Sequence, residues 1–432
     1  MATRLLLMLL LTALGVAPAA QIDPGSASQV AKLTASDGAA NNLFGLSVAV
    51  SGDTAVVGAH WASPNGAAYV FQRDQGGTGA WGQVTRLIPS DADYFGARVA
   101  ISGDTIVVSG SDSDSEIGSA YLFYRNQGGA DAWGQVAKLV ASDGARNDDF
   151  GSAVAIAGDT VVIGAPKADL PGAFDQGAVY VFYRNQGGTN AWGQAAKLTA
   201  VDAAGQDHFG HAAAIDGDVV VVSADQDDVG FENNQGAAYV FYRNQGGADA
   251  WGQVAKLVAS DGAEDDYFGN SVSISGDLAI VGAEYAHVSG HEHQGAAYLY
   301  QRNQGGLDVW GQVKKLTAAD GYEYDHFGNA VAIDGDMVAV GAYYAYVGAN
   351  WNQGVVYLFA RDQGGAGTWG QVAELAAADG AAADQFGCSV ATRGGLVVAG
   401  AWLADVGGNV DQGAAYVFRF GPYRVYLPVL VK

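Results

Sequence analysis

The sequence predicts an all-β fold, a seven-bladed β-propeller of four-stranded antiparallel blades, and three observations predict it. One unit recurs seven times, each copy contains four short stretches with strand patterning, and tight-turn signals separate these stretches. The copies are marked by Phe-Gly pairs at residues 44, 95, 150, 209, 268, 327 and 386. Their spacing is 51, then 55, then 59 residues four times, so the length differences are confined to the first copies.

The third copy shows the four strands expected in each blade. Its apolar stretches cover residues 150–158, 159–165, 177–184 and 192–200. They alternate or are rich in β-branched and aromatic residues, and they lack a helical period. The first two meet at Gly158-Asp159, and a glycine-first pair suits a tight hairpin because a positive φ costs glycine little.

The last blade predicts how the ring closes. Six fourth strands begin with tryptophan, at Trp81, Trp133, Trp192, Trp251, Trp310 and Trp369. The seventh copy stops after its third strand, at Phe418, whereas residues 29–35 near the N-terminus match the fourth-strand pattern. We therefore predict that residues 29–35 form the outer strand of the last blade. Closure of this kind protects the sheet edges.

The N-terminus has the pattern of a secretory signal. A positive start leads into an apolar run of 12 residues, Leu5 to Val16, and then into Ala17-Pro18-Ala19. This run is shorter than the roughly 20 residues that a spanning helix needs, so no membrane span is expected. We divide the chain into a signal peptide at 1–19, a propeller at 20–420 and a tail at 421–432. The protein is expected to be secreted or held at the cell surface.

Composition excludes some classes of partner. The chain has 45 acidic and 21 basic residues, a net charge of -24, which repels nucleic acid and anionic lipid. The single cysteine, Cys388, allows no internal disulfide, and its apolar strand context predicts a buried structural thiol. We expect a monomer.

The repeated residues resemble those of the FG-GAP repeat family. Each unit has Phe-Gly, then an alternating strand, then Val-Val-Gly-Ala and Gly-Ala-Ala-Tyr-Val-Phe, and Gly164-Ala165-Pro166 keeps the GAP itself. The resemblance covers residues 29–418. It implies an integrin α-subunit-like propeller and an extracellular adhesion or ligand-binding role, often with calcium. The calcium motif of that family, an Asp-x-Asp-x-Asp-Gly-type loop between the first two strands, is replaced here by Gly-Asp, so no family calcium site is carried over.

Strand parity predicts two unlike ends of the propeller. The interblade links (fourth strand to next first strand) and the intrablade links (second to third strand) must share one end, which we call the upper face. Of the 45 acidic residues, 17 lie in interblade links and 13 in intrablade links, opposed there only by Arg146 and Lys167. The upper face is therefore expected to attract cations and basic groups.

Aromatic residues of the intrablade links are the candidate ligand-binding residues. They break the repeat, and rings beside carboxylates suit stacking on sugars or anchoring of a protein partner. The alternative is that they pack over the central channel as a plug. The candidates, with one neighbouring histidine, are Trp61, Tyr285, His287, Tyr343, Tyr346, Trp351 and Trp402.

Alternating carboxylates on two of these links are candidate Ca²⁺ ligands, although neither link has the full EF-hand pattern. They are Asp112, Asp114, Glu116, Asp225 and Asp227. Solvated acidic loops are the alternative. The histidines at 287, 291 and 293 could in principle hold a transition metal, but a flexible loop fixes no geometry. Aspartates also recur in every interblade link, either as a ring of cation sites or, as we favour, as bonds to turn backbone.

Catalytic motifs are lacking: there is no Gly-x-Ser-x-Gly elbow, HExxH or P-loop. We therefore expect a non-catalytic adhesion or ligand-binding propeller, with an extracellular protein or glycan as its partner and Ca²⁺ as a candidate cofactor. A carbohydrate-binding lectin is the alternative, and a hydrolase is the third.

Overall fold

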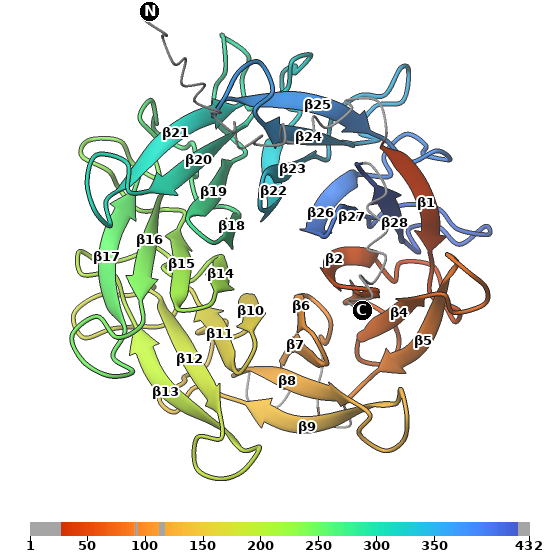
Figure 1. The fold of residues 1–432 in the computed structure, drawn as a ribbon, viewed down its shortest axis with the longest axis horizontal. Helices are drawn as coiled ribbons and strands as arrows, with labels where there is room; N and C mark the ends of the chain where they lie inside the picture. The colour runs from red at the N-terminus through yellow and green to blue at the C-terminus, as the bar shows by residue number, and fades with distance from the viewer. Residues whose placement is uncertain (1–26, 90, 92–93, 112–116, 422–432) are drawn as a thin grey trace, which may run out of the picture.

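The computed structural model describes residues 27–89, 91, 94–111 and 117–421. Its 28 strands form seven four-stranded antiparallel sheets arranged as blades around a central axis (Figure 1). The predicted seven-bladed propeller is confirmed. The described part of the chain contains no helix that could cross a membrane.

Each of the first four blades is one consecutive run of strands. Blade 1 consists of β2 (Phe44–Ser51), β3 (Thr54–Ala59), β4 (Ala67–Arg73) and β5 (Trp81–Leu87). Blade 2 consists of β6 (Val99–Ser102), β7 (Thr105–Ser111), β8 (Gly118–Arg125) and β9 (Trp133–Leu139). Blade 3 consists of β10 (Ala153–Ala157), β11 (Thr160–Ala165), β12 (Ala178–Arg184) and β13 (Trp192–Leu198). Blade 4 consists of β14 (Ala213–Asp216), β15 (Val219–Ala224), β16 (Ala237–Tyr242) and β17 (Gly252–Leu257).

The remaining three blades follow the same order, except that the last borrows a strand. Blade 5 consists of β18 (Val272–Ser275), β19 (Leu278–Ala283), β20 (Ala296–Arg302) and β21 (Trp310–Leu316). Blade 6 consists of β22 (Phe327–Asp334), β23 (Met337–Ala342), β24 (Val355–Arg361) and β25 (Trp369–Leu375). Blade 7 consists of β26 (Phe386–Arg393), β27 (Leu396–Ala401), β28 (Ala414–Arg419) and the N-terminal β1 (Ser28–Leu33).

The borrowed strand closes the ring, as the sequence predicted. β1 pairs antiparallel with β28, with Leu33 opposite Ala415 (Figure 1). Two contacts then tie β1 to the link that leads into its blade. Lys32 forms an ion pair with Asp379, and the Ala378 amide donates a hydrogen bond to the Gln29 side-chain carbonyl at 2.9 Å.

The core lies between adjacent blades and is built from residues present in every copy. The Phe of each Phe-Gly pair is buried, and it packs against a buried third-strand tyrosine, as Phe44 does on Tyr69 with ring centroids 5.4 Å apart. In five blades the second strand carries glycine where the next blade approaches most closely, whereas blades 2 and 4 carry Ser109 and Ser223 there. A Cβ atom on Gly400 would lie only 1.9 Å from the Gly45 carbonyl oxygen, so a larger residue does not fit there.

The repeated aspartates of the interblade links also have structural partners. One per link pairs with the basic residue of the following fourth strand, as Asp143 does with Lys197 at 2.7 Å. A second accepts a backbone N–H bond three residues back, as Asp148 does from Ala145 at 2.8 Å. The second type is the turn bond that the sequence favoured, and the first is an ion pair that the sequence did not predict.

Blade 6 is the exception to this ion-pair pattern. Its fourth strand carries Glu374 where the other six carry lysine or arginine. Burial and the nearby carboxylate of Asp320 raise the pKa of Glu374. A pair of like charges therefore replaces the ion pair in this blade.

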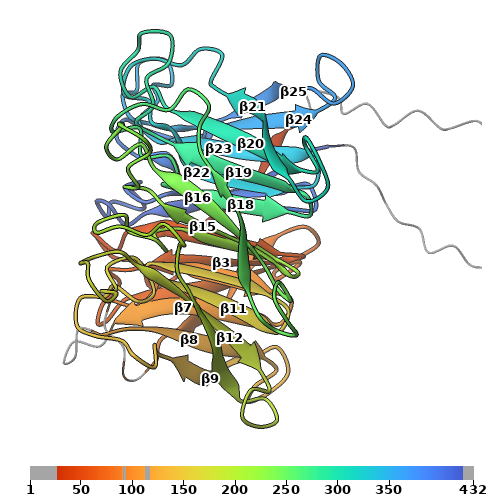
Figure 2. The ribbon, with the colours of Figure 1, turned by 90° about the vertical axis from the view of Figure 1, so that its left-hand side faces the viewer.

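Both kinds of link lie at the same end of the propeller, as strand parity predicts. In the side view of Figure 2 the long links project to the left, and this end is the upper face. The short hairpin turns lie at the opposite, lower end. Residues of the upper links therefore surround one mouth of the central channel.

Candidate functional site

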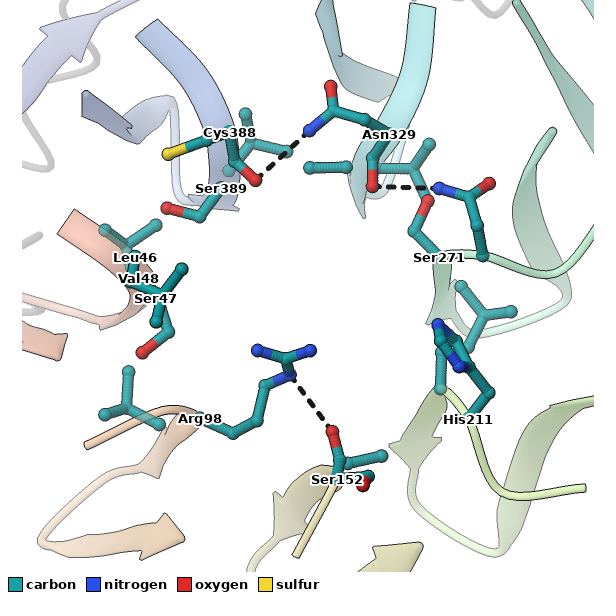
Figure 3. Close-up of a pocket in the computed structure, with 18 of the residues that line it drawn as sticks. Leu46, Ser47, Val48, Arg98, Ser152, His211, Ser271, Asn329, Cys388 and Ser389 are labelled. Atoms are coloured by element: carbon teal, nitrogen blue, oxygen red, sulfur yellow. Dashed lines mark hydrogen bonds between the residues drawn. The ribbon is translucent and has the colours of Figure 1, made fainter. Parts of the chain in front are cut away.

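A cavity of about 470 Å³ occupies the central channel. Its wall is built from the first residues of the innermost segments of all seven blades, and Figure 3 shows these residues facing one another across the channel. Three residues from the intrablade links, Glu284, Tyr343 and Trp402, complete the wall. The cavity therefore adjoins the upper face.

The wall is variable although the blades that build it repeat. The residue directly after Phe-Gly lines or borders the channel, and it differs from blade to blade: Leu46, Ala97, Ser152, His211, Asn270, Asn329 and Cys388. The next position holds Ser47, Arg98, Ala153, Ala212, Ser271, Ala330 and Ser389. Because the Phe-Gly before these positions is invariant, blade construction does not require the differences. They are available for recognition of a ligand.

Several of these side chains join neighbouring blades in a collar around the channel. The Ser389 hydroxyl donates to the Gly45 carbonyl at 2.7 Å, and the Ser271 hydroxyl donates to the Gly328 carbonyl at 2.8 Å. The Asn329 amide donates to the Cys388 carbonyl at 3.1 Å (Figure 3). In blades 3 and 4, both described at these positions, no such bond reaches the next blade. The collar is therefore open beside His211.

Arg98 is the one arginine among the described residues of the wall, and its side chain extends toward the middle of the channel (Figure 3). Its Nε donates to the Ser152 carbonyl at 3.0 Å, and its Nη1 donates to the carbonyl of the preceding residue, Ala97, at 3.1 Å. Its hydrogen-bond partners are backbone carbonyl groups, no carboxylate among the described residues forms an ion pair with it, and its side chain borders the cavity. Arg98 is thus a cation held in place by neutral carbonyl groups.

His211 faces a buried carboxyl from the intrablade link of its own blade. Its Nδ1 lies 3.5 Å from the Asp225 Oδ2. Burial, helped by the positive charge of Arg98, lowers the pKa of His211 to about 4, although Glu284 opposes this. Burial raises the pKa of Asp225 to about 6. At neutral pH the site therefore presents a neutral imidazole beside a carboxylate.

Aromatic rings gather beside the channel on blades 5 and 6. Tyr285 contacts His326 and His293 edge to face, with centroids 5.0 and 5.1 Å apart. Tyr343 lies against Tyr344, with centroids 4.2 Å apart. The wall residue Glu284 comes from the same link as Tyr285, and its carboxylate lies 3.6 Å from the His326 Nδ1. A polar wall and an aromatic rim therefore meet at this side of the mouth.

The FG-GAP repeat family matches the chain in every blade. The matched residues are 27–71, 81–123, 133–182, 192–241, 251–300, 310–359 and 369–418. The chain belongs to the FG-GAP repeat family. No curated protein sequence matches it significantly.

Solved structures share the propeller fold at low identity. One of 237 matching chains is the periplasmic gluconolactonase of Pseudomonas aeruginosa, with 14% identity and a TM-score of 0.50. The match covers 77% of this chain and 86% of that chain. At this identity the similarity concerns the fold alone.

In this FG-GAP propeller the aspartates of the hairpins between the first two strands form ion pairs. Asp53 lies 2.9 Å from the Arg73 guanidinium at the end of the third strand, and Asp159 lies 3.4 Å from Arg184. These aspartates therefore have a basic partner where the family resemblance would place calcium ligands.

The structure separates the predicted ligand-binding residues into four groups. Tyr343 and Trp402 line the channel, and the Trp402 Nε1 donates to the Gln385 side chain at 2.5 Å. Tyr285 and His287 belong to the neighbouring cluster, where His287 contacts His293. Trp61 packs near His60 and Tyr94 in a separate depression.

Tyr346 and Trp351 stand apart from the channel wall, with exposed fractions of 62% and 52%. The sequence left two alternatives for these aromatic residues, exposure to a ligand or packing over the central channel. Each alternative therefore describes some of them. Neither describes the whole set.

The predicted Ca²⁺ ligands do not form one cluster in the described residues. Asp112, Asp114 and Glu116 lie outside the part of the chain that the structure describes. Asp225 faces His211, whereas Asp227 accepts a hydrogen bond from Tyr239 and pairs with Lys256 at 2.9 Å. Over the described residues, no group of three or more His, Cys, Asp or Glu side chains could hold a metal.

Cys388 differs from the expectation of a buried core thiol. It lines the channel and is only partly buried, with its Sγ 3.5 Å from the Gly45 carbonyl oxygen. The difference arises because the residue after Phe-Gly faces the channel and not the neighbouring sheet. Burial nevertheless raises the pKa of the thiol to about 11, which keeps it protonated at neutral pH.

Sequence reasoning missed Arg98, His211, Asn270, Asn329 and Glu284. These residues occupy strand starts and one link start, and such positions look like scaffold when each copy is considered alone. The sequence nevertheless contained an indication of these positions. An alignment of the seven copies shows that the residues directly after the invariant Phe-Gly pair differ from copy to copy. Arg98 is the clearest case, since serine or alanine fills its position in every other blade.

Proposed function

We propose that this protein is an exported, monomeric, non-catalytic binding module that holds an extracellular ligand at its upper face, centred on the mouth of the central channel. One observation carries the proposal: the channel wall changes from blade to blade, whereas the residues that pack the blades repeat. Selection for a ligand explains such variation, while selection for the ring alone would favour seven equal copies. The acidic upper links add a field that attracts basic groups.

Support for a binding role, as opposed to a catalytic one, comes from the hydroxyl groups of the wall. The hydroxyls of Ser47, Ser271 and Ser389 donate to backbone carbonyl groups of the next blade. A carbonyl oxygen is too weak a base to activate a nucleophile. The wall hydroxyls therefore act as structural donors in this account.

A saccharide is the ligand class that the cavity favours over an adhesive protein surface. A volume of about 470 Å³ lies within the usual range of small-molecule sites. Its wall offers Glu284, His211 and Arg98 for hydroxyl and anionic groups, and the rings of Tyr343 and Trp402 for the face of a sugar. Exposed Trp351 and Trp61 would extend such a surface beyond the channel.

A binding survey tests the proposal. Purified protein is applied to a glycan array and to a panel of extracellular matrix proteins, each with and without chelator. We expect a hit that Trp402→Ala and Tyr343→Ala weaken. Leu307→Ala is the matched control, because this residue is 87% exposed and lies in a turn at the lower end.

The outcomes separate the candidate functions. A glycan hit supports the lectin form and a protein hit the adhesion form, and loss with chelator would add Ca²⁺ to either. No hit on either surface, or a hit that survives both channel variants, would overturn the proposed site. Turnover of a bound glycan would replace the binding role with a hydrolase.

A further inference from the structure

We infer that Arg98 anchors the carboxylate of an acidic saccharide in the central channel. This inference rests on the saccharide form of the proposed function and specifies the chemistry of the ligand. It assigns the guanidinium to the carboxylate, and the remaining polar and aromatic wall to the sugar ring.

The construction of the propeller does not require an arginine at position 98. The equivalent residue is serine in blades 1, 5 and 7 and alanine in blades 3, 4 and 6. The serines donate to the next blade, as Ser47 does to the Gly96 carbonyl at 3.2 Å. A small residue therefore fulfils the structural role at this position, and the long charged side chain needs another explanation.

The guanidinium of Arg98 retains hydrogen-bonding capacity toward the channel. Its bonds to Ser152 and Ala97 use Nε and one Nη1 hydrogen, and among the described residues its Nη2 has no partner. Arginines elsewhere in the chain are treated differently. Six of those that end the third strands face carboxylates, as Arg73 faces Asp53 at 2.9 Å. In a protein of net charge -24, an arginine without a carboxylate partner is an open anion site.

The geometry favours a carboxylate over a more highly charged anion. A guanidinium is a planar fork that matches the two oxygens of a carboxylate. The same cavity contains Glu284, and Asp225 lies behind His211. These acids would repel a phosphate monoester, which carries close to two negative charges at neutral pH. A single carboxylate meets the positive guanidinium with less repulsion.

The rest of the wall favours a sugar as the carrier of that carboxylate. Carboxylates such as Glu284 accept hydrogen bonds from hydroxyl groups, and the neutral imidazole of His211 both donates and accepts. Tyr343 and Trp402 provide ring surface on the blades beside Glu284. Burial, and after it the positive charge of Arg98, lowers the pKa of His211, in keeping with the placement of both side chains on the wall of one cavity.

Calorimetric titration tests the inference with four sugar probes, the acidic D-galacturonate and D-glucuronate and the neutral D-galactose and D-glucose. Sodium acetate and an acidic peptide serve as comparison ligands without a sugar ring. Arg98→Ser restores the residue that blades 1, 5 and 7 use, so the fold should persist, and thermal melting verifies this. Arg98→Lys keeps the charge but loses the fork. Arg393→Ser is the control, because it removes one positive charge from the exposed lower end.

We expect at least one uronate to bind the wild-type protein at least about tenfold more tightly than its neutral counterpart, since hydrogen bonds to charged groups are stronger than those between neutral groups. Arg98→Ser should remove this preference, Arg98→Lys should recover part of it, and Arg393→Ser should retain it.

Equal binding of uronate and neutral sugar, unchanged uronate binding by Arg98→Ser, or no uronate binding would overturn the inference. If sodium acetate binds as tightly as the uronate, the sugar ring contributes nothing and the saccharide part of the inference is overturned. The same part is overturned if an acidic peptide binds more tightly than the uronates. If the uronates fail while an array or matrix hit still depends on Trp402, the inference falls and the proposed function stands.

Discussion

The Lys32 Nζ lies 2.6 Å from the Asp379 Oδ2, although 347 residues separate the two in the chain. This contact joins the N-terminal strand to the link that leads into the C-terminal blade. The ring is therefore closed by the six-residue strand β1, which comes from the N-terminal end of the chain and completes the C-terminal blade.

Deletion of residues 20–36 is expected to open this ring. The deletion removes all of β1, including the buried Leu33, so the free energy of unfolding should fall by on the order of 5 kcal/mol. Lys32→Ala alone should cost less than about 1 kcal/mol, because the ion pair is partly exposed. Thermal and urea unfolding check both values, and an unchanged midpoint for the deletion would refute the closure.

Glu374→Lys is expected to stabilise the protein by about 1 kcal/mol. The substitution removes a carboxyl whose pKa is raised by burial and by Asp320, and it introduces the lysine present at this position in other blades. The reciprocal change in blade 5, Lys315→Glu, should destabilise by breaking the pair with Asp261. Urea midpoints of the two variants should move in opposite directions. Movement in the same direction would contradict the assigned pairing.

Asp207→Asn is expected to stabilise the protein at pH 7.5 but not at pH 4. Burial raises the pKa of Asp207 from its ordinary 3.8 to about 6. The stability that this group contributes is fully present below pH 3.8 and is lost as the pH rises through 6. An amide cannot ionise, and Asn42 already accepts the equivalent turn bond in blade 1. The gain at pH 7.5 should be about 1 kcal/mol after allowance for solvent screening. Urea melts at both pH values check this, and a pH-independent difference would count against it.

Gly400→Ala is expected to destabilise the protein by about 3 kcal/mol, because the added methyl collides with the Gly45 carbonyl of the next blade. Blade 4 has Ser223 at the equivalent position, so the spacing between blades 4 and 5 already accommodates a Cβ atom there. Ser223→Ala should therefore cost only about 1 kcal/mol, through loss of the bond from the Ala212 amide. If both variants lower the free energy of unfolding by the same amount, the spacing between blades does not determine the effect.

Repetition made the architecture predictable. Seven Phe-Gly pairs, six tryptophan-led strands and one unmatched strand at residues 29–35 sufficed for the blade count and the closure. The upper face also followed from parity, because antiparallel order fixes which links share an end.

The channel wall was not predictable in the same way. Alternation along a strand places side chains on two sheet faces, but Arg98 and His211 precede the paired part of their strands and face the channel because the blades converge there. Loop aromatics show the same limit. Trp402 begins its link and lines the channel, whereas Trp351 lies near the end of the preceding link and is 52% exposed. The path of a link depends on tertiary contacts that local patterns do not encode.

A crystal structure of the protein with the strongest hit from the binding survey tests the central claim most directly. The account predicts ligand density in the channel mouth, in contact with Trp402 or Tyr343 and with at least one of Arg98, His211 and Glu284. Density on the outer strands or at the lower end, with the channel free of ligand, would contradict it.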